Sequence, residues 1–206
     1  DGFLNIISIF SFIGIGLGVA VLIVVMSVMN GFRTELVNKI IGFNAHMTVK
    51  PYENKIAKEK LDDQNLKSIS ESSIFSNSGE GIMIKKDITK GILLRGYFAK
   101  DFSKLDIVNN GNFLGSENKL SNNSISISKE LSFSLNLEIG DEITLMSSAG
   151  VQTIIGNLPK QKKFTVVSLF DSGVIDFDNN VAFINLVTLE EFFNLKPKNR
   201  NLEIYL

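Results

Sequence analysis

Three oxygen-bearing side chains in the last quarter of the sequence have the spacing with which a calcium-binding loop begins. Asp176, Asp178 and Asn180 would supply the first three ligand positions of such a loop. The sixth position, however, is Val181 where the loop needs glycine, and the twelfth is Val187 where it needs glutamate. The sequence therefore predicts no calcium site here.

Other residue combinations that carry catalysis or bind cofactors are missing from the sequence. His46 is the single histidine and there is no cysteine, so a cysteine–histidine metal cluster and a thiol nucleophile are both excluded. No glycine-rich loop is followed by Lys and Ser or Thr, and no Gly-x-Ser-x-Gly motif occurs. Gly14, Gly16 and Gly18 alternate with apolar residues, but no strand–turn–helix pattern surrounds them. We expect no cofactor and no enzymatic activity in this chain.

The segment 147–162 lies between two predicted strands, so its simplest arrangement is a long hairpin, with its tip near Gly156-Asn157. Apolar residues at the end of such an arm cannot reach the core, and exposed apolar residues on a projection indicate a binding partner. The edge of the arm could also pair with a strand of that partner. The alternative is a loop folded back on the domain surface. The candidate binding residues are Ile154, Ile155, Gly156, Asn157, Leu158, Pro159 and Lys160.

Charge is distributed very unevenly along the chain. No charged side chain occurs between Gly2 and Phe32, and all 21 Lys and Arg residues lie at Arg33 or later. This apolar run exceeds the roughly 20 residues that cross a bilayer, and a lone segment can satisfy its backbone in lipid only as a helix. We therefore predict a transmembrane helix in residues 1–32, in contact with membrane lipid. A buried core helix is the alternative. The formal net charge of −1 argues against nucleic-acid binding, which needs a basic field.

Two features of this helix concern its neighbours. Gly14 and Gly18 are four residues apart and share one helix face, where small side chains let another helix approach closely. The alternative is that glycine is simply frequent in membrane helices. After the apolar run, apolar and charged residues follow helical spacing, which predicts an amphipathic stalk over residues 33–45 that stops near Gly42. The charges on this single flank do not fix which side of the membrane the stalk occupies.

From His46 onward, short strands and short helices are mixed, which predicts an α+β domain over residues 46–206. The predicted strands are His46–Lys50, Gly81–Lys86, Gly91–Tyr97, Ser124–Ile127, Glu142–Met146, Lys163–Phe170, Asn180–Ile184 and Asn201–Leu206. The predicted helices are Lys55–Ile69, Ser128–Leu135 and a short one capped by Thr188 that ends at Phe193. In the second helix, Ser128 is the expected cap and Leu131, Phe133 and Leu135 are the expected apolar anchors.

Several blocks of the sequence resemble the LolC/LolE family, the membrane subunits of the lipoprotein-releasing ABC transporter. The most specific block is Met26–Arg33. The resemblance covers most of the chain and is weak between Pro51 and Gly91. It is carried further by Gly42–His46, Leu93–Gly96, Ile127–Leu131 and Ile139–Leu145.

The resemblance implies a multi-pass protein of the bacterial inner membrane. Family members have four membrane helices, with a large periplasmic domain between the first and the second. The present chain would be that first helix and that domain, with Asp1 at a point inside a longer protein. The domain resembles the MacB-type periplasmic core, which has two subdomains and, in LolC-type subunits, a protruding hook hairpin. Residues 151–162 lie where that hook would be.

The same resemblance implies the partners. They are a cytoplasmic ATPase subunit that hydrolyses the ATP, a second membrane subunit in a hetero- or homodimer, the lipoprotein cargo, and a periplasmic chaperone similar to LolA that the hook captures. The sequence does not separate a LolC from a LolE or a combined form. Two further readings stay open: a MacB-like efflux subunit, and a regulatory membrane protein like FtsX.

Overall fold

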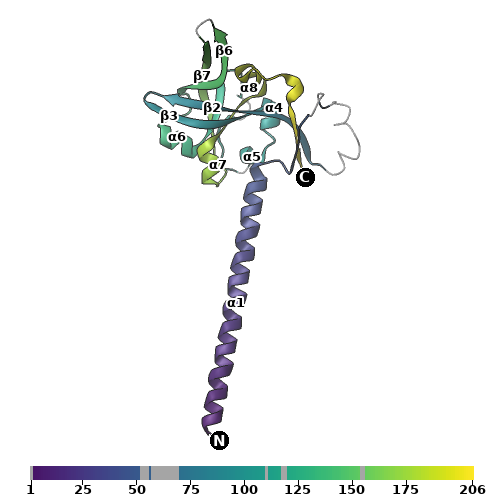
Figure 1. The fold of residues 1–206 in the computed structure, drawn as a ribbon, viewed down its shortest axis with the longest axis vertical. Helices are drawn as coiled ribbons and strands as arrows, with labels where there is room; N and C mark the ends of the chain where they lie inside the picture. Colours follow the sequence, from purple (N-terminus) through teal and green to yellow (C-terminus); the bar gives the residue numbers. More distant parts are fainter. Residues whose placement is uncertain (1, 52–55, 57–69, 110, 117–119, 154–155) are drawn as a thin grey trace. The chain divides into compact units, whose positions relative to one another are not determined.

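The computed structural model describes residues 2–51, 56, 70–109, 111–116, 120–153 and 156–206 (Figure 1). The contacts between residues divide the chain into two units, residues 1–40 and residues 41–206. Each unit is described by itself below.

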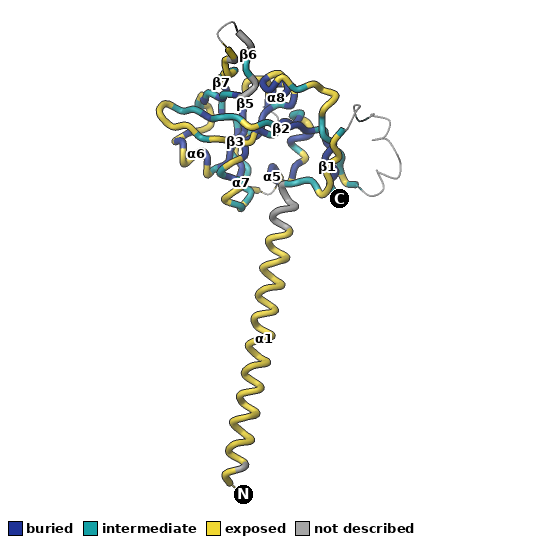
Figure 2. The backbone as a smooth tube through the Cα atoms, in the orientation of Figure 1, coloured by how far each residue is buried: buried dark blue, intermediate teal, exposed yellow. Residues whose placement is uncertain are grey.

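The first unit consists of helix α1, Gly2–Phe43, whose last residues fall within the range of the second unit. Its stretch Asn5–Val37 is long and apolar enough to cross a membrane. The described residues along it are exposed, as the colouring in Figure 2 shows, and exposure of so many apolar residues is costly in water and favourable in lipid. The helix predicted from the apolar run is confirmed. It continues without a break through the charged residues after Phe32 and ends one residue after Gly42.

Most strands of the second unit close into a barrel. The order of pairing is β2–β3–β8–β5–β7–β6, and β6 then pairs with β2 again. The pairs β3–β8 and β5–β7 are parallel and the others antiparallel. Closure removes the free strand edges that an open sheet would present to other chains. The strands are β2 Ser72–Lys85, β3 Ile88–Tyr97, β5 Ser124–Ser128, β6 Glu142–Thr153, β7 Gly156–Phe170 and β8 Val181–Asn185.

The barrel interior is the first hydrophobic core. Each barrel strand contributes residues from one of its faces, as the period of two along a strand requires. Helices α6, Lys129–Leu135, and α8, Leu186–Phe193, add side chains to the same core. The interior residues are Met83, Ile92, Leu94, Ile125, Ile127, Ile143, Leu145, Phe164, Val166, Ala182 and Ile184, and the helices add Leu131, Leu135, Leu189, Phe192 and Phe193.

Strand β8 separates this core from a second one. Its residues Ala182 and Ile184 belong to the barrel interior, whereas Val181 and Phe183 face the second core. Short helices α4, Ala99–Phe102, and α5, Asp106–Asn109, contribute to the second core, where aromatic rings surround Phe183. The domain is therefore mixed α+β, as predicted. Residues 41–206 form one compact unit with connected sheets, and the division into two subdomains that the resemblance implied stays a prediction.

A small sheet extends from the first half of β2. Strand β9, Asn201–Tyr205, pairs with Ser72–Ser76 of β2, and β1, Met47–Val49, pairs with β9. Strand β2 thus belongs both to the barrel and to this small sheet. The remaining elements are β4 Leu114–Gly115, which pairs with β7, helix α7 Ile175–Asn180, and the 3₁₀ helix η2 Pro197–Asn199.

Most predicted elements are present, with corrected bounds. Strand β2 begins at Ser72, well before the predicted start at Gly81, because pairing with β9 holds a stretch rich in serine and glycine that has little strand propensity. The predicted helix over 55–69 lies outside the described residues, apart from Ile56.

Two side-chain assignments in the helices were wrong. Phe133 is 88% exposed, because the helix is only two turns long and turns that position away from the core. Helix α8 begins before Thr188: the side chain of Asn185 caps it by accepting a hydrogen bond from Val187 N, and Thr188 Oγ1 instead donates to Asn122 O. The predicted cap at Ser128 is confirmed, since its side chain accepts from Leu131 N.

Candidate docking hairpin

Strands β6 and β7 form a long antiparallel hairpin, as the sequence predicts. Their register runs from Glu142 opposite Thr165 to Thr153 opposite Gly156. The last register pair, Thr153 opposite Gly156, places the tip next to Gly156, as predicted, while Gly156 and Asn157 themselves are paired residues of β7. Ile154 and Ile155, the other predicted tip residues, lie outside the described residues. Figure 1 shows the far part of the hairpin extending beyond the barrel.

The hairpin has two parts with different surroundings. The near part belongs to the barrel, where Ile143, Leu145, Phe164 and Val166 alternate into the core. The register then shifts between Ser147 and Gly150, which marks a bulge in β6. We call residues 150–153 and 156–159, beyond that bulge, the distal arm. A bulge bends the strand that carries it and changes the direction of the residues beyond it.

The sequence of the distal arm suits this change. Pro159 stands opposite Gly150 at the bulge, and a proline has no N–H to give to the ladder. Gly156 has a φ of +126°, which other residues rarely adopt. Leu158 is 59% exposed, and both Gly156 and Pro159 are exposed as well. The described end of the arm therefore presents an apolar side chain to its surroundings, away from both cores.

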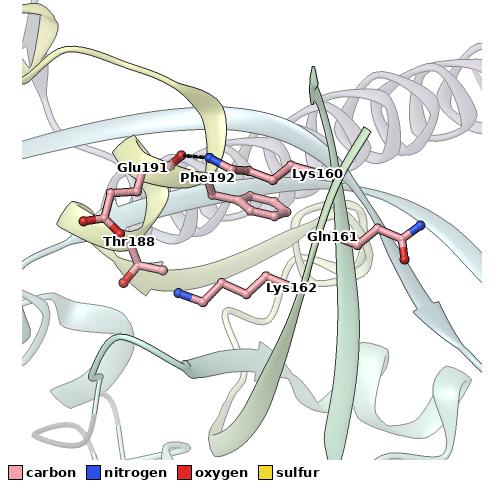
Figure 3. A pocket seen from close by; sticks show the side chains of 6 residues that line it. All are labelled: Lys160, Gln161, Lys162, Thr188, Glu191 and Phe192. Atoms are coloured by element: carbon pink, nitrogen blue, oxygen red, sulfur yellow. Dashed lines mark hydrogen bonds between the residues drawn. The ribbon is translucent and has the colours of Figure 1, made fainter. Parts of the chain in front are cut away.

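Lys160 has a different position from the one the sequence suggested. Its ammonium donates to the main-chain oxygen of Glu191 at 2.6 Å and to Asn194 Oδ1 at 3.3 Å. Both acceptors lie at the carboxyl end of helix α8, where carbonyl groups lack partners within the helix and a cation is favoured. Figure 3 shows this side chain reaching from β7 to α8. Lys160 is therefore already engaged within the domain.

A shallow hollow of about 200 Å³ lies between β7 and α8. Its volume is below the roughly 300 to 1,000 Å³ typical of small-molecule sites. In Figure 3, Lys160 and Lys162 point toward α8 while Gln161 points away, as alternation along a strand requires. Lys162 Nζ donates to Asn122 O at 3.1 Å and lies 5.5 Å from the centre of the Phe164 ring. The hollow is lined by Lys160, Gln161, Lys162, Thr188, Glu191 and Phe192.

A network of polar side chains lies elsewhere, around the buried carboxylate of Glu203 on β9. Its Oε1 accepts from Ser76 Oγ at 2.6 Å and Arg95 Nη2 at 3.0 Å, and its Oε2 accepts from the hydroxyls of Tyr97 at 2.7 Å and Tyr205 at 2.9 Å. Burial by itself would raise the pKa of Glu203. The charge of Arg95 and the hydrogen bonds from Ser76, Tyr97 and Tyr205 outweigh it, so this pKa lies below its usual value.

This network also holds the chain where it leaves α1. Arg95 Nη1 donates to Asn44 Oδ1 at 3.0 Å, and Leu206 N donates to His46 Nδ1 at 3.2 Å. The segment after the helix is thereby fastened to β9 in addition to the β1–β9 pairing. Sequence reasoning missed Glu203. The available signal was a single acid between the apolar residues Leu202 and Ile204 of the strand, which indicates a buried carboxylate with partners.

The calcium-like triplet serves local structure. Asp178 is buried and its carboxylate accepts from Ser172 N at 3.1 and 3.2 Å, while Asn180 Nδ2 donates to the Asp176 carbonyl at 2.8 Å. Burial raises the pKa of Asp178. Within the described ranges, no group of three His, Asp or Glu side chains is placed to hold a metal ion.

The two glycines proposed for helix packing lie on α1. A side-chain carbon added at Gly14 or Gly18 would meet nothing within 4 Å in this chain. Their contact with another membrane helix stays a prediction.

Comparison with known proteins identifies relatives. The chain is 26% identical over 204 residues to the lipoprotein-releasing system transmembrane protein LolC of Xylella fastidiosa, covering 95% of this chain and 48% of that protein. It is 28% identical over 217 residues to LolC of Neisseria meningitidis serogroup B, covering 100% of this chain and 51% of that protein. The chain thus spans about half the length of these curated relatives.

Solved structures give more distant similarities. The extracellular domain of the ABC-type transporter YknZ from Gram-positive bacteria has a TM-score of 0.46 at 12% identity, with 77% of this chain and 82% of that chain covered. The periplasmic region of MacB from Actinobacillus actinomycetemcomitans has a TM-score of 0.45 at 12% identity, with 81% and 77% covered.

The model of the MacB-like periplasmic core domain matches residues 8–206. Together with the LolC relatives, this match confirms the resemblance to LolC/LolE membrane subunits. The chain belongs to the family of proteins with a MacB-like periplasmic core domain.

Proposed function

We propose that this chain is part of the membrane subunit of an ATP-driven complex that extracts lipoproteins from the bacterial inner membrane and passes them to a periplasmic chaperone. Helix α1 would be the first membrane helix, residues 33–45 the stalk, and residues 46–206 the periplasmic domain. The partners would be a cytoplasmic ATPase, a second membrane subunit of the same or a different kind, and a chaperone similar to LolA.

The observation that carries this proposal is the β6–β7 hairpin. An arm that extends beyond the barrel and exposes Leu158 at its described end is suited to contact another protein, since exposed apolar side chains on a projection gain free energy when a partner covers them. The LolC relatives are named for lipoprotein release, which supports the same reading, and the resemblance to LolC-type subunits implies a hook at this hairpin.

The physical task explains why such a handover needs a partner. Each CH₂ group of a lipid chain costs about 0.8 kcal/mol to move from the membrane into water. A lipoprotein therefore leaves the bilayer only when work is done on it and when an apolar site receives its acyl chains. A docked chaperone supplies that site, and ATP hydrolysis in the cytoplasmic subunit supplies the work.

Site-specific photocrosslinking in intact cells tests the proposal. The photoreactive residue replaces Leu158 in the full-length protein, since Lys160 is engaged with α8. Ile175, 67% exposed at the start of α7, gives a control position of similar size and exposure. We expect a crosslink from Leu158 to a periplasmic chaperone and none from Ile175.

The other outcomes are equally informative. Absence of a crosslink from Leu158, with normal protein level and normal assembly with the ATPase, would remove the docking role. It would leave a LolE-like subunit, a MacB-like efflux subunit or an FtsX-like regulator. Equal crosslinks from both positions would show that contact with the chaperone is unspecific.

The stalk has a separate test. Because α1 continues unbroken from the apolar run to Phe43, it can transmit motion from the membrane to the domain. A flexible Gly-Ser linker inserted after Asn38 should uncouple ATP hydrolysis from lipoprotein release, whereas an insertion of the same length in the turn between β2 and β3 should not. Unchanged release with the stalk insertion would contradict this role.

A further inference from the structure

The distal arm departs from the barrel at a point where the hairpin is fastened to helix α8. Ser147 and Lys160 face each other across the hairpin as the last register pair before the bulge. Both donate to main-chain oxygens in the last turn of α8. Ser147 Oγ bonds Phe192 O at 3.1 Å, and Lys160 Nζ bonds Glu191 O at 2.6 Å. The side chains of this one register pair thus donate hydrogen bonds to two successive carbonyl groups of α8.

Helix α8 itself is firmly held, so it can act as a fixed support. Leu189 and Phe192 are buried in the barrel core, and Phe193 is 8% exposed. The buried carboxylate of Glu190 forms a two-armed ion pair with Arg200, with both N–O distances 2.7 Å. Such bidentate pairs fix orientation as well as adding attraction.

The bulge makes this fastening necessary. Beyond Ser147, strand β6 carries extra residues that have no register partner on β7, so the ladder alone does not define the angle at which the distal arm continues. Pro159, the residue next to Lys160 on the side of the hairpin tip, has no N–H to give to the ladder. The bonds to α8 supply the missing constraint at this one level of the hairpin.

We infer that the pair Ser147–Lys160, bonded to the last turn of α8, is the joint that sets the direction of the distal arm, and that Lys160 is a positioning residue for docking. This inference rests on the proposed docking function. Lys160 acts through α8 and not by touching the partner, which separates its role from that of Leu158. Figure 3 shows the bond on which the joint depends.

Distance measurements between spin labels test the joint without any partner. The chain has no cysteine, so once any cysteine in the rest of the full-length protein is replaced, labels can be placed at Leu158→Cys on the arm and Glu130→Cys on exposed α6. In the full-length protein in detergent, we expect a narrow distance distribution. Lys160→Met should broaden it, because methionine keeps much of the apolar stem and lacks the ammonium. Lys160→Arg should restore most of the narrow distribution.

Lys163→Met is the matched control. Lys163 lies three residues further along the same strand, and its ammonium forms an ion pair with the carboxylate of Glu142 on β6. The substitution therefore removes the same charge without affecting a bond to α8. It should leave the distribution unchanged. Equal widths for Lys160→Met and the unsubstituted protein would overturn the joint, and so would equal broadening by Lys163→Met.

Crosslinking to the chaperone then tests whether Lys160 is a positioning residue for docking. With the photoreactive residue at Leu158, Lys160→Met should lower crosslinking to the chaperone by about threefold to tenfold, as expected for loss of one charged hydrogen bond in a partly exposed place. Lys160→Arg should recover it, and the thermal midpoint of Lys160→Met should fall by no more than about 4 °C. A broadened arm with undiminished crosslinking would overturn the positioning role. No crosslink even without substitution would reject the docking function, while the distances would still decide the joint.

Discussion

The surroundings of Glu203 and the distal arm of the hairpin show two opposite uses of polar and apolar residues in one domain. Around Glu203, a charged group is buried, and each of its two carboxylate oxygens accepts two hydrogen bonds. On the distal arm, an apolar side chain, Leu158, is exposed and the proline next to it weakens the ladder. Each arrangement is unfavourable unless something compensates for it.

The two regions differ in where the stabilising contacts come from, and so in whether a residue serves mainly folding or mainly binding. Arg95, Ser76 and two tyrosines compensate Glu203 from within the domain, so the network contributes to folding and fastens the segment after α1 to β9. Leu158 is 59% exposed, and under the proposed function a partner protein covers it. Substitutions should therefore affect mainly stability at the first region and mainly binding at the second.

The largest effect is expected from Glu203→Ala. It leaves the Arg95 guanidinium buried without its carboxylate, and breaking a buried pair in this way typically costs about 3 to 5 kcal/mol. The free energy of unfolding, measured with urea on the protein in detergent, should fall by that amount. Glu130→Gln on the surface of α6 is the control. A loss as small as that of the control would mean that the network adds little to folding.

A smaller loss is expected from Gly79→Ala. A side-chain carbon there would lie 2.7 Å from the ring of Phe193, so α8 would have to shift, at a cost of about 1 to 3 kcal/mol. Gly91→Ala, where nothing lies within 4 Å, should be neutral. Because α8 supports the joint, Gly79→Ala should also broaden the spin-label distances to the arm. Unchanged spin-label distances would show that the position of α8 does not control the direction of the distal arm.

Acid should weaken the Glu203 network. The pKa of Glu203 in the folded state lies below its unfolded value, so the folded state binds fewer protons between the two values. Its contribution to stability is complete above the unfolded pKa and is lost as the pH falls through the folded pKa. Urea unfolding at a series of pH values from about 7 down to about 3 should show this fall. Glu203→Gln should flatten it, and an equally steep fall would assign the acid sensitivity to other groups.

The smallest change in stability is expected from Leu158→Ser. An exposed side chain outside both cores should alter the free energy of unfolding by no more than about 0.5 kcal/mol. Crosslinking to the chaperone from a neighbouring arm position should nevertheless fall. A large loss of stability would show that Leu158 packs within the domain, and would remove the contrast with Glu203.

Much of the fold was predictable because local patterns determine it. The charge-free run before Arg33 indicates a membrane helix by length alone, and alternation locates strands such as Ser124–Ile127 to within one residue. The long hairpin was expected from two strong strand patterns on either side of residues 147–162. The first half of β2 was not predictable, since its serines and glycines extend only because β9 pairs with them.

The candidate site divides in the same way. Sequence by itself determined that residues 147–162 connect two strands as a long hairpin, because strong strand patterns lie on either side of them. The projection of apolar side chains within residues 151–162 was an expectation from that arrangement. Tertiary structure decided the role of Lys160, whose acceptor on α8 is 31 residues away in the chain. It also brought Glu203 to Arg95, over an interval of 108 residues. Contacts between distant residues depend on barrel closure and strand order, and these are properties of the whole chain that no local spacing records.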